Sequence, residues 1–191
     1  MLNATLPPPP PHYNRLATLC VVNGFTMPSA LPEGQLLRTL VASKPGGNIL
    51  ELGTGMGLSL AWMVDGLRGG ASILSLDNDT QLVDIVSAEI QNPDVTILTV
   101  DGDAWIQQYD GPKFDLIFAD TWPGKYRFLE ETIDLLAPGG LYVADDMNEQ
   151  ANWPEGHAEK AAKLIETLID HPKLDCTYLD WSTGVILGTR L

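Results

Sequence analysis

Hydrophobic positions follow two different periods along this chain. Short runs rich in apolar residues predict buried strands, and apolar residues three or four positions apart predict amphipathic helices. The predicted strands are 49–52, 71–76, 95–100, 114–119 and 141–144. Helical spacing fills several of the connections between them, and the last of these, 126–136, is predicted to end before Pro138-Gly139-Gly140. This alternation predicts repeated βα units around a parallel sheet.

The two ends of the chain depart from this pattern. Residues 1–33 contain five consecutive prolines and predict an arm outside the repeated units, while helical spacing begins at Gly34. After a predicted helix at 155–170, segments 174–180 and 185–189 predict an antiparallel hairpin. We therefore expect an α/β, Rossmann-like, doubly wound and mostly parallel seven-stranded sheet, with helices on both faces and an antiparallel C-terminal hairpin. Residues 34–191 are expected to form a single domain.

The net charge limits the classes of ligand that we expect, and the cysteines indicate the cell compartment. The formal net charge of −14 would repel phosphate backbones and anionic lipid surfaces, so we expect a small-molecule ligand rather than nucleic acid or a membrane. Cys20 and Cys176 are far apart in the sequence and are predicted to be free thiols, as in a reducing cytoplasm. The sequence shows no signal peptide pattern and no membrane-spanning apolar run, which also favours a cytoplasmic protein.

The segment Glu51-Leu52-Gly53-Thr54-Gly55-Met56-Gly57 joins a predicted strand to a predicted helix. Glycines in such a turn let a ligand approach the backbone and permit positive φ angles. A dinucleotide fingerprint requires a glycine at the sixth position from Gly53, where this chain has Leu58. The Glu-x-Gly-x-Gly-x-Gly pattern instead resembles the first motif of class I S-adenosylmethionine-dependent methyltransferases. Asp77, at the end of the next strand, can accept hydrogen bonds from ribose hydroxyls.

Three aspartates follow the last two strands of the predicted parallel sheet. Asp120 follows one strand, and Asp145 and Asp146 follow the next. Ligands of open α/β sheets bind at this edge, so we expect the three carboxylates to converge there. Converging carboxylates repel one another unless they are protonated or bridged by a cation, and their hard oxygen atoms favour Mg²⁺, Ca²⁺ or Mn²⁺.

Three further motifs narrow the resemblance. Glu33-Gly34-Gln35, the segment 120–126 and the segment 139–146 resemble motifs of the catechol and caffeoyl-CoA type O-methyltransferases, and the resemblance runs from about Glu33 to the C-terminus. It implies methyl transfer to an oxygen of a small phenol- or catechol-like acceptor, and a homodimer. By position it implies metal binding by Asp120, Asp145 and Asp146. The cofactor residues that it implies are Glu51, Gly53, Thr54, Gly55, Ser59, Asp77, Asn78, Asp103, Ala104, Trp105 and Asp120.

Two residues depart from the pattern of this group. Asp146 stands in place of the usual asparagine, and Pro123 stands where the relatives have a catalytic lysine. Asp120 and Lys125 are therefore the candidates for the catalytic role, and Lys125 requires a differently shaped turn to reach the pocket. The candidates for lining the acceptor pocket are Trp122, Tyr126 and Trp153. We interpret His157 and His171, which flank the last predicted helix, as surface or capping residues.

Three alternatives remain open at this point. One keeps S-adenosylmethionine but dispenses with the metal, so that Asp120 acts directly on an oxygen or nitrogen acceptor. A second is a nucleotide-binding oxidoreductase, which Leu58 disfavours. A third is a module that binds S-adenosylmethionine without turnover.

Overall fold

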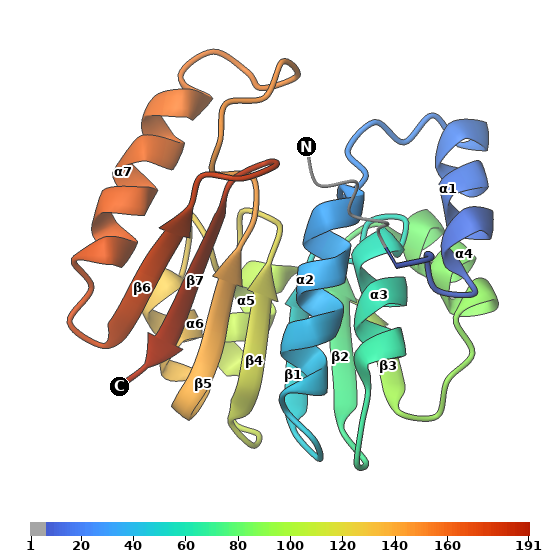
Figure 1. Cartoon of the computed structure of the whole chain (residues 1–191), viewed down its shortest axis with the longest axis horizontal. Helices are drawn as coiled ribbons and strands as arrows, with labels where there is room; N and C mark the ends of the chain where they lie inside the picture. Colours follow the sequence, from blue (N-terminus) through green and yellow to red (C-terminus); the bar gives the residue numbers. More distant parts are fainter. Residues whose placement is uncertain (1–6) are drawn as a thin grey trace.

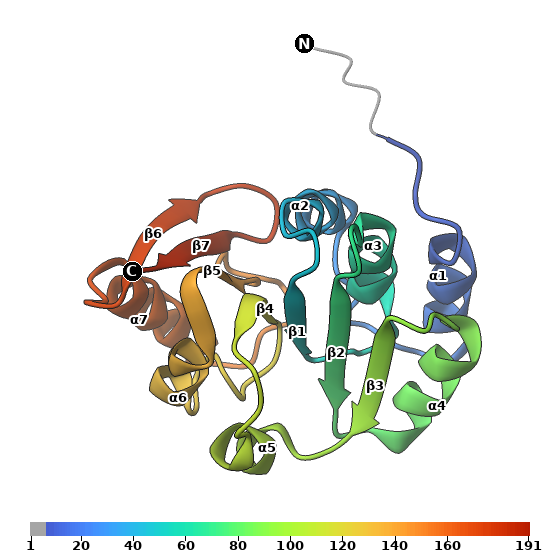
Figure 2. The same ribbon diagram turned by 90° about the horizontal axis from the view of Figure 1, so that it is seen from below.

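A computed structural model describes residues 7–191 of the chain. Seven strands form one sheet in the order β3-β2-β1-β4-β5-β7-β6, with helices on both of its faces (Figures 1 and 2). The strands are β1 (Asn48–Leu52), β2 (Ser72–Asp77), β3 (Val95–Thr99), β4 (Phe114–Ala119), β5 (Leu136–Ala144), β6 (Leu174–Leu179) and β7 (Val185–Arg190). The helices are α1 (Tyr13–Val22), α2 (Leu31–Ala42), α3 (Leu58–Gly66), α4 (Thr80–Glu89), α5 (Gly102–Gln108), α6 (Leu129–Asp134) and α7 (His157–Ile169).

The strand directions confirm the expected fold. The five strands β1 to β5 pair in parallel, and β7 pairs antiparallel with both β5 and β6. The strand order reverses between β1 and β4, which lie side by side although they are separated along the chain. Asp120 N, just after β4, donates to Leu52 O at the end of β1 at 2.9 Å. This reversal brings the two loops together at the edge where such sheets bind ligands.

Successive strand residues feed two apolar clusters on opposite faces of the sheet, as the alternation of side chains in a strand requires. Ile49 and Leu116 belong to a cluster that also contains residues of α1 to α4. Leu50 and Ile117 belong to the other cluster, which contains residues of α5 to α7. Both faces of the central strands are therefore covered, which explains why these strands are apolar throughout.

The region between β4 and β5 corrects one sequence prediction. The helix expected over 126–136 is only Leu129–Asp134, and β5 already begins at Leu136. The Pro-Gly-Gly segment lies within β5 instead of before it. Gly139 has a φ of +75°, and the register between β4 and β5 shifts there, so an irregularity in the strand replaces the turn that glycine and proline suggested.

The N-terminal region contains a helix that the sequence pattern did not predict. In α1, Leu16 is fully buried, and the ring of Tyr13 meets Trp62 of α3 edge-on with ring centroids 5.8 Å apart. Helix α2 begins at Leu31, three residues before the predicted start, with Pro32 in its first turn. The division of the chain at residue 33 into an arm and a domain stays a prediction.

Two other expectations concern the cysteines and membrane spans. Cys20 is buried, Cys176 is half-buried and both are free thiols, which confirms the interpretation of their spacing. In the part of the chain from residue 7 to residue 191, no helix has the length and apolar character needed to cross a bilayer.

Candidate active site

The glycine loop after β1 folds against the ends of two neighbouring strands. Gly53 has a φ of +100°, and a Cβ at this position would lie 2.8 Å from the main-chain oxygen of Asp120. The amide of Gly53 donates to Leu76 O at 2.9 Å, and that of Gly55 donates to Asp77 Oδ2 at 2.8 Å. Glycine at position 53 is thus required by both its backbone conformation and its surroundings. The hydrogen bond from Gly55 also holds the Asp77 carboxylate in one orientation.

Glu51 is buried beneath this loop and lines none of the cavities described below. Its carboxylate accepts hydrogen bonds from Ser59 Oγ at 2.6 Å and from Ser75 Oγ at 2.5 Å. Burial raises the pKa of Glu51 to about 8, against the opposing effect of these two hydroxyl donors. Glu51 therefore orients Ser59, which does line a cavity, and direct contact between Glu51 and a cofactor stays a prediction.

Two neighbouring cavities lie at the carboxyl ends of the parallel strands. The first, of about 320 Å³, extends along the glycine loop. Of the residues that the resemblance assigns to the cofactor, it is lined by Gly53, Thr54, Gly55, Ser59, Asp77, Asn78 and Asp120. The structure thus brings seven residues from three separate segments of the chain to one cavity.

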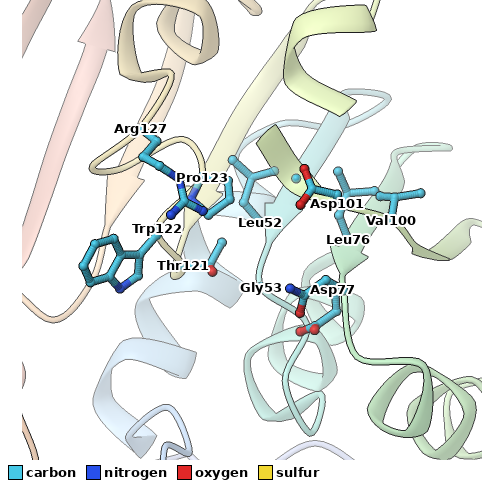
Figure 3. A pocket seen from close by; sticks show the side chains of 12 residues that line it. Leu52, Gly53, Leu76, Asp77, Val100, Asp101, Thr121, Trp122, Pro123 and Arg127 are labelled. Atoms are coloured by element: carbon cyan, nitrogen blue, oxygen red, sulfur yellow. The ribbon is translucent and has the colours of Figure 1, made fainter. Parts of the chain in front are cut away.

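A smaller pocket of about 240 Å³ shares Gly53 and Asp77 with this cavity. Figure 3 shows Trp122 and Arg127 on one side of the pocket and Asp101 on the other. Neither Asp101 nor Arg127 was assigned a role from the sequence. The signal for Asp101 was its position as the N-cap of α5, where it accepts from Ala104 N at 2.8 Å, but α5 itself was not predicted.

Three of the residues that the resemblance assigns to the cofactor, Asp103, Ala104 and Trp105, lie outside both of these spaces. Asp103 forms an ion pair with Arg127, with 2.7 Å between Oδ2 and Nε. Trp105 packs against Tyr109 with ring centroids 4.5 Å apart, and with Ala104 it lines a separate hollow. Their contact with a ligand stays a prediction, and Asp103 is already committed to an ion pair within the protein.

The second large cavity, of about 670 Å³, contains all three aspartates that the sequence predicts to converge: Asp120, Asp145 and Asp146. Asp145 is 2% exposed, and its Oδ1 accepts hydrogen bonds from Asp146 N at 2.7 Å and from Thr183 Oγ1 at 2.5 Å. Burial raises the pKa of Asp120 well above its usual range, and the charge of Asp145 adds to this effect.

Lys125 projects into the same group of carboxylates. It is only 4% exposed, its Nζ donates to the main-chain oxygen of Asp145 at 2.7 Å, and Asp120 Oδ1 lies 3.9 Å away. The turn that carries it is tightly closed, because Gly124 N donates to Arg127 O at 2.7 Å. This shape brings Lys125 into the cavity, two residues beyond Pro123, where the resemblance implied a lysine.

The arrangement does not fit a divalent metal. Within residues 7–191, no three acidic, histidine or cysteine side chains are placed so that they could share an ion. Oδ1 of Asp145 is occupied by two donors, and the ammonium of Lys125 lies between Asp120 and the main chain of Asp145. A cation bridging these carboxylates would lie close to the buried positive charge of Lys125, which would repel it. The donor set therefore does not support the metal site that the resemblance implied.

Aromatic side chains form one wall of this second cavity. The three residues predicted for the acceptor pocket, Trp122, Tyr126 and Trp153, all line it together with His157. The His157 ring lies 4.5 Å from that of Trp153 and 5.3 Å from that of Tyr126, between centroids. This wall provides apolar faces on which a planar acceptor can pack.

Both histidines near α7 were wrongly interpreted as surface or capping residues. His157 is 8% exposed, and its Nε2 lies 3.3 Å from the hydroxyl of Tyr126. His171 is 5% exposed, and its Nε2 lies 2.7 Å from Oε1 of Glu130. In each case the partner comes from the segment between β4 and β5, and the local sequence around α7 contains no signal for such a distant contact.

Comparison with known proteins identifies the family of the chain. The sequence profile of a family described as "Methyltransferase domain" matches residues 50–147, which run from β1 through the glycine loop to the residue after Asp146. The chain belongs to this methyltransferase family. This methyltransferase is also 25% identical over 182 residues to the O-methyltransferase ankF of Aspergillus thermomutatus, a match that covers 81% of this chain and 75% of that protein. Over 124 residues it is 29% identical to a catechol O-methyltransferase of Niastella koreensis, covering 60% of this chain and 56% of that protein.

Solved structures share the fold of the methyltransferase. An O-methyltransferase from Bacillus cereus in complex with SAH superposes with a TM-score of 0.83 at 21% identity, covering 98% of this chain and 94% of that chain. The O-methyltransferase TomG from Streptomyces achromogenes, in complex with SAM, gives a TM-score of 0.84 at 17% identity, covering 98% of this chain and 92% of that chain. These structures show the shared fold, and the resemblance to the catechol type O-methyltransferases, first indicated by short motifs, is confirmed by the 124-residue match to the protein of Niastella koreensis.

Proposed function

We propose that this methyltransferase transfers the methyl group of S-adenosylmethionine to an oxygen atom of a small hydroxylated acceptor. The observation that carries the proposal is the pair of neighbouring cavities, which share Asp120 and Asp146 as lining residues. The first follows a glycine loop and the second has an aromatic wall. The names of the relatives, which include a catechol O-methyltransferase, support oxygen as the accepting atom.

The first cavity has the features that S-adenosylmethionine requires. Gly53 and Gly55 line it with backbone atoms alone, and Ser59 and Asp77 place a hydroxyl and a carboxylate along the cavity. Asp77 accepts from the amides of Gly55 and Asp79 and so is held in one orientation, suited to accepting from ribose hydroxyls. When bound, this cofactor supplies a methyl group on a positively charged sulfur.

In the second cavity the aromatic wall holds the acceptor ring, and Asp120 accepts the proton of its hydroxyl. The oxygen then forms a bond to the methyl carbon while the carbon–sulfur bond breaks, with its electron pair going to sulfur. The raised pKa of the buried Asp120 carboxyl makes it a stronger base than an exposed aspartate. Opposite charges are consumed in this step, so a site shielded from water favours it.

Methyl transfer is tested directly by incubating the protein with S-adenosylmethionine carrying a labelled methyl group and a panel of phenols and catechols. We expect label in an O-methylated product, and a loss of about 100-fold or more in kcat for Asp120→Asn. Asp84→Asn, on the exposed face of α4, is the matched control and should retain full activity. Transfer to none of the acceptors, or unchanged kcat in Asp120→Asn, would contradict the proposal.

A further inference from the structure

We infer that the ammonium of Lys125 binds the acceptor oxygen in this enzyme, in the place that a divalent cation would occupy, and that the acceptor therefore needs only one hydroxyl. This inference rests on the proposed function and specifies its substrate class. It depends on four features of the site: the turn, the burial of Lys125, the surrounding charges and the donor capacity of an ammonium group.

The turn between β4 and α6 holds Lys125 in a fixed direction. Gly124 has a φ of +80°, and a Cβ there would lie 2.3 Å from Leu52, so this position is restricted to glycine. The carbonyl of Gly124 accepts from the hydroxyl of the fully buried Tyr142 at 2.7 Å. A backbone bridge between Pro123 and Arg127 closes the turn. The side chain of Lys125 therefore starts from a backbone anchored on both sides.

Acidic side chains predominate around the second cavity, and Lys125 offsets part of their charge. Asp120, Asp145 and Asp146 line it, and Lys125 is the one lysine or arginine among the described residues that do so. Its Nζ lies within 4 Å of Asp120 Oδ1. Its hydrogen bond to the carbonyl of Asp145 holds it beside the carboxyl ends of β4 and β5. A buried positive charge here reduces the repulsion between the carboxylates. From the sequence, that role was assigned to a metal ion.

The donor capacity of Lys125 determines which acceptor it can bind. An ammonium group has three hydrogen atoms to donate. One is used on the carbonyl of Asp145, and the distance of 3.9 Å to Asp120 is that of an ion pair rather than a hydrogen bond. Lys125 can therefore donate to one acceptor oxygen beside Asp120. A metal ion with several open positions can bind both oxygens of a vicinal diol, whereas an ammonium is a point charge that needs only one.

The experiment compares 4-methylphenol with 4-methylcatechol as acceptors, using protein dialysed against a chelator and then assayed with and without Mg²⁺. We expect kcat/KM values within about tenfold of each other for the two acceptors. We also expect no dependence of either value on Mg²⁺. Methylation of the catechol alone, or activity that appears only with Mg²⁺, would overturn the inference and leave the proposed function intact.

Variants of Lys125 separate binding of the acceptor from folding. Lys125→Met should lower kcat/KM by about 100-fold or more, the cost of losing one charge-stabilising donor. Its affinity for S-adenosylhomocysteine in calorimetry should stay unchanged, and Lys125→Arg should recover part of the activity. Lys163→Met, an exposed position on α7, is the control. Full activity in Lys125→Met would contradict the inference. If the unmodified protein does not bind S-adenosylhomocysteine, the proposed function fails and the inference fails with it.

Discussion

The hydroxyl of Thr183 lies 2.5 Å from Oδ1 of the buried Asp145. The same hydroxyl and the Thr183 amide also contact Oε1 of Glu33, at 2.9 Å and 3.1 Å. Thr183 lies in the turn between β6 and β7, and Glu33 lies in the first turn of α2. One side chain of the C-terminal hairpin therefore connects the start of α2 to the acceptor cavity, across 150 residues of sequence.

Removing this hydroxyl should destabilise the fold. Thr183→Val removes a hydroxyl that lies within hydrogen-bond distance of two buried carboxylates and has one proton to donate, and we expect the free energy of unfolding to fall by about 1–3 kcal/mol. Chemical denaturation measures the change. Thr177→Val makes the same substitution at an exposed position of β6 and should change stability little. Equal stability of the two variants would show that the contact contributes nothing.

The pH dependence of stability should reveal the buried Glu51. Its pKa is raised from 4.5 to about 8 in the folded protein, so between these values the folded state holds a proton that the unfolded chain has released. The stabilisation that this proton provides is complete below pH 4.5 and is lost as the pH rises toward 8. We therefore expect wild type to lose stability relative to Glu51→Gln between pH 5 and pH 8. A constant difference across that range would contradict the raised pKa.

The contact between α2 and α3 leaves no room for a side chain at Gly34. A Cβ there would lie 2.1 Å from Cδ1 of Trp62, which is itself buried. Gly34→Ala should therefore lower the unfolding free energy by about 1–3 kcal/mol, despite the better helix propensity of alanine. Thr39→Ala, on the exposed side of α2, serves as the control. A thermal melt of Gly34→Ala at or above the wild-type midpoint would show that the helices can separate at no cost.

Substitutions in the aromatic wall should weaken binding of the acceptor without changing binding of the cofactor. Trp153 lines the second cavity but not the first, so Trp153→Ala should raise KM for the acceptor by about 10-fold or more. Its affinity for S-adenosylhomocysteine should be unchanged. Trp181→Ala, in the turn between β6 and β7 and 45% exposed, removes a tryptophan that lines neither cavity. An equal rise in KM for both variants would argue against the assignment of the wall.

The sequence predicted the elements whose signals are local. The spacing of Gly53, Gly55 and Gly57 identified the loop, because positive φ angles and close backbone contacts are required within a few residues. The apolar strands and the hairpin were predicted for the same reason. Helix α1 was missed because only Leu16 and Cys20 are buried in it, too few to produce a clear helical spacing.

The missed parts of the site depend on contacts between distant segments. The inward position of Lys125 follows from the conformation of Gly124 and from the hydroxyl of Tyr142, which is 18 residues further along the chain. Asp103 in α5 forms its ion pair with Arg127, which lies in the turn between β4 and α6. Such pairings arise only once the sheet has formed, so no local pattern could reveal them.

The most direct test of the central claim is a calorimetric titration of the wild-type protein with S-adenosylhomocysteine, with NADH as the control ligand. The glycine loop and the cavity that contains Ser59 and Asp77 predict saturable binding at micromolar concentrations and no heat from NADH. The same affinity is expected in the presence of a chelator, because no cation is assigned to this cavity. Binding of NADH without binding of S-adenosylhomocysteine would contradict the methyltransferase account of the site.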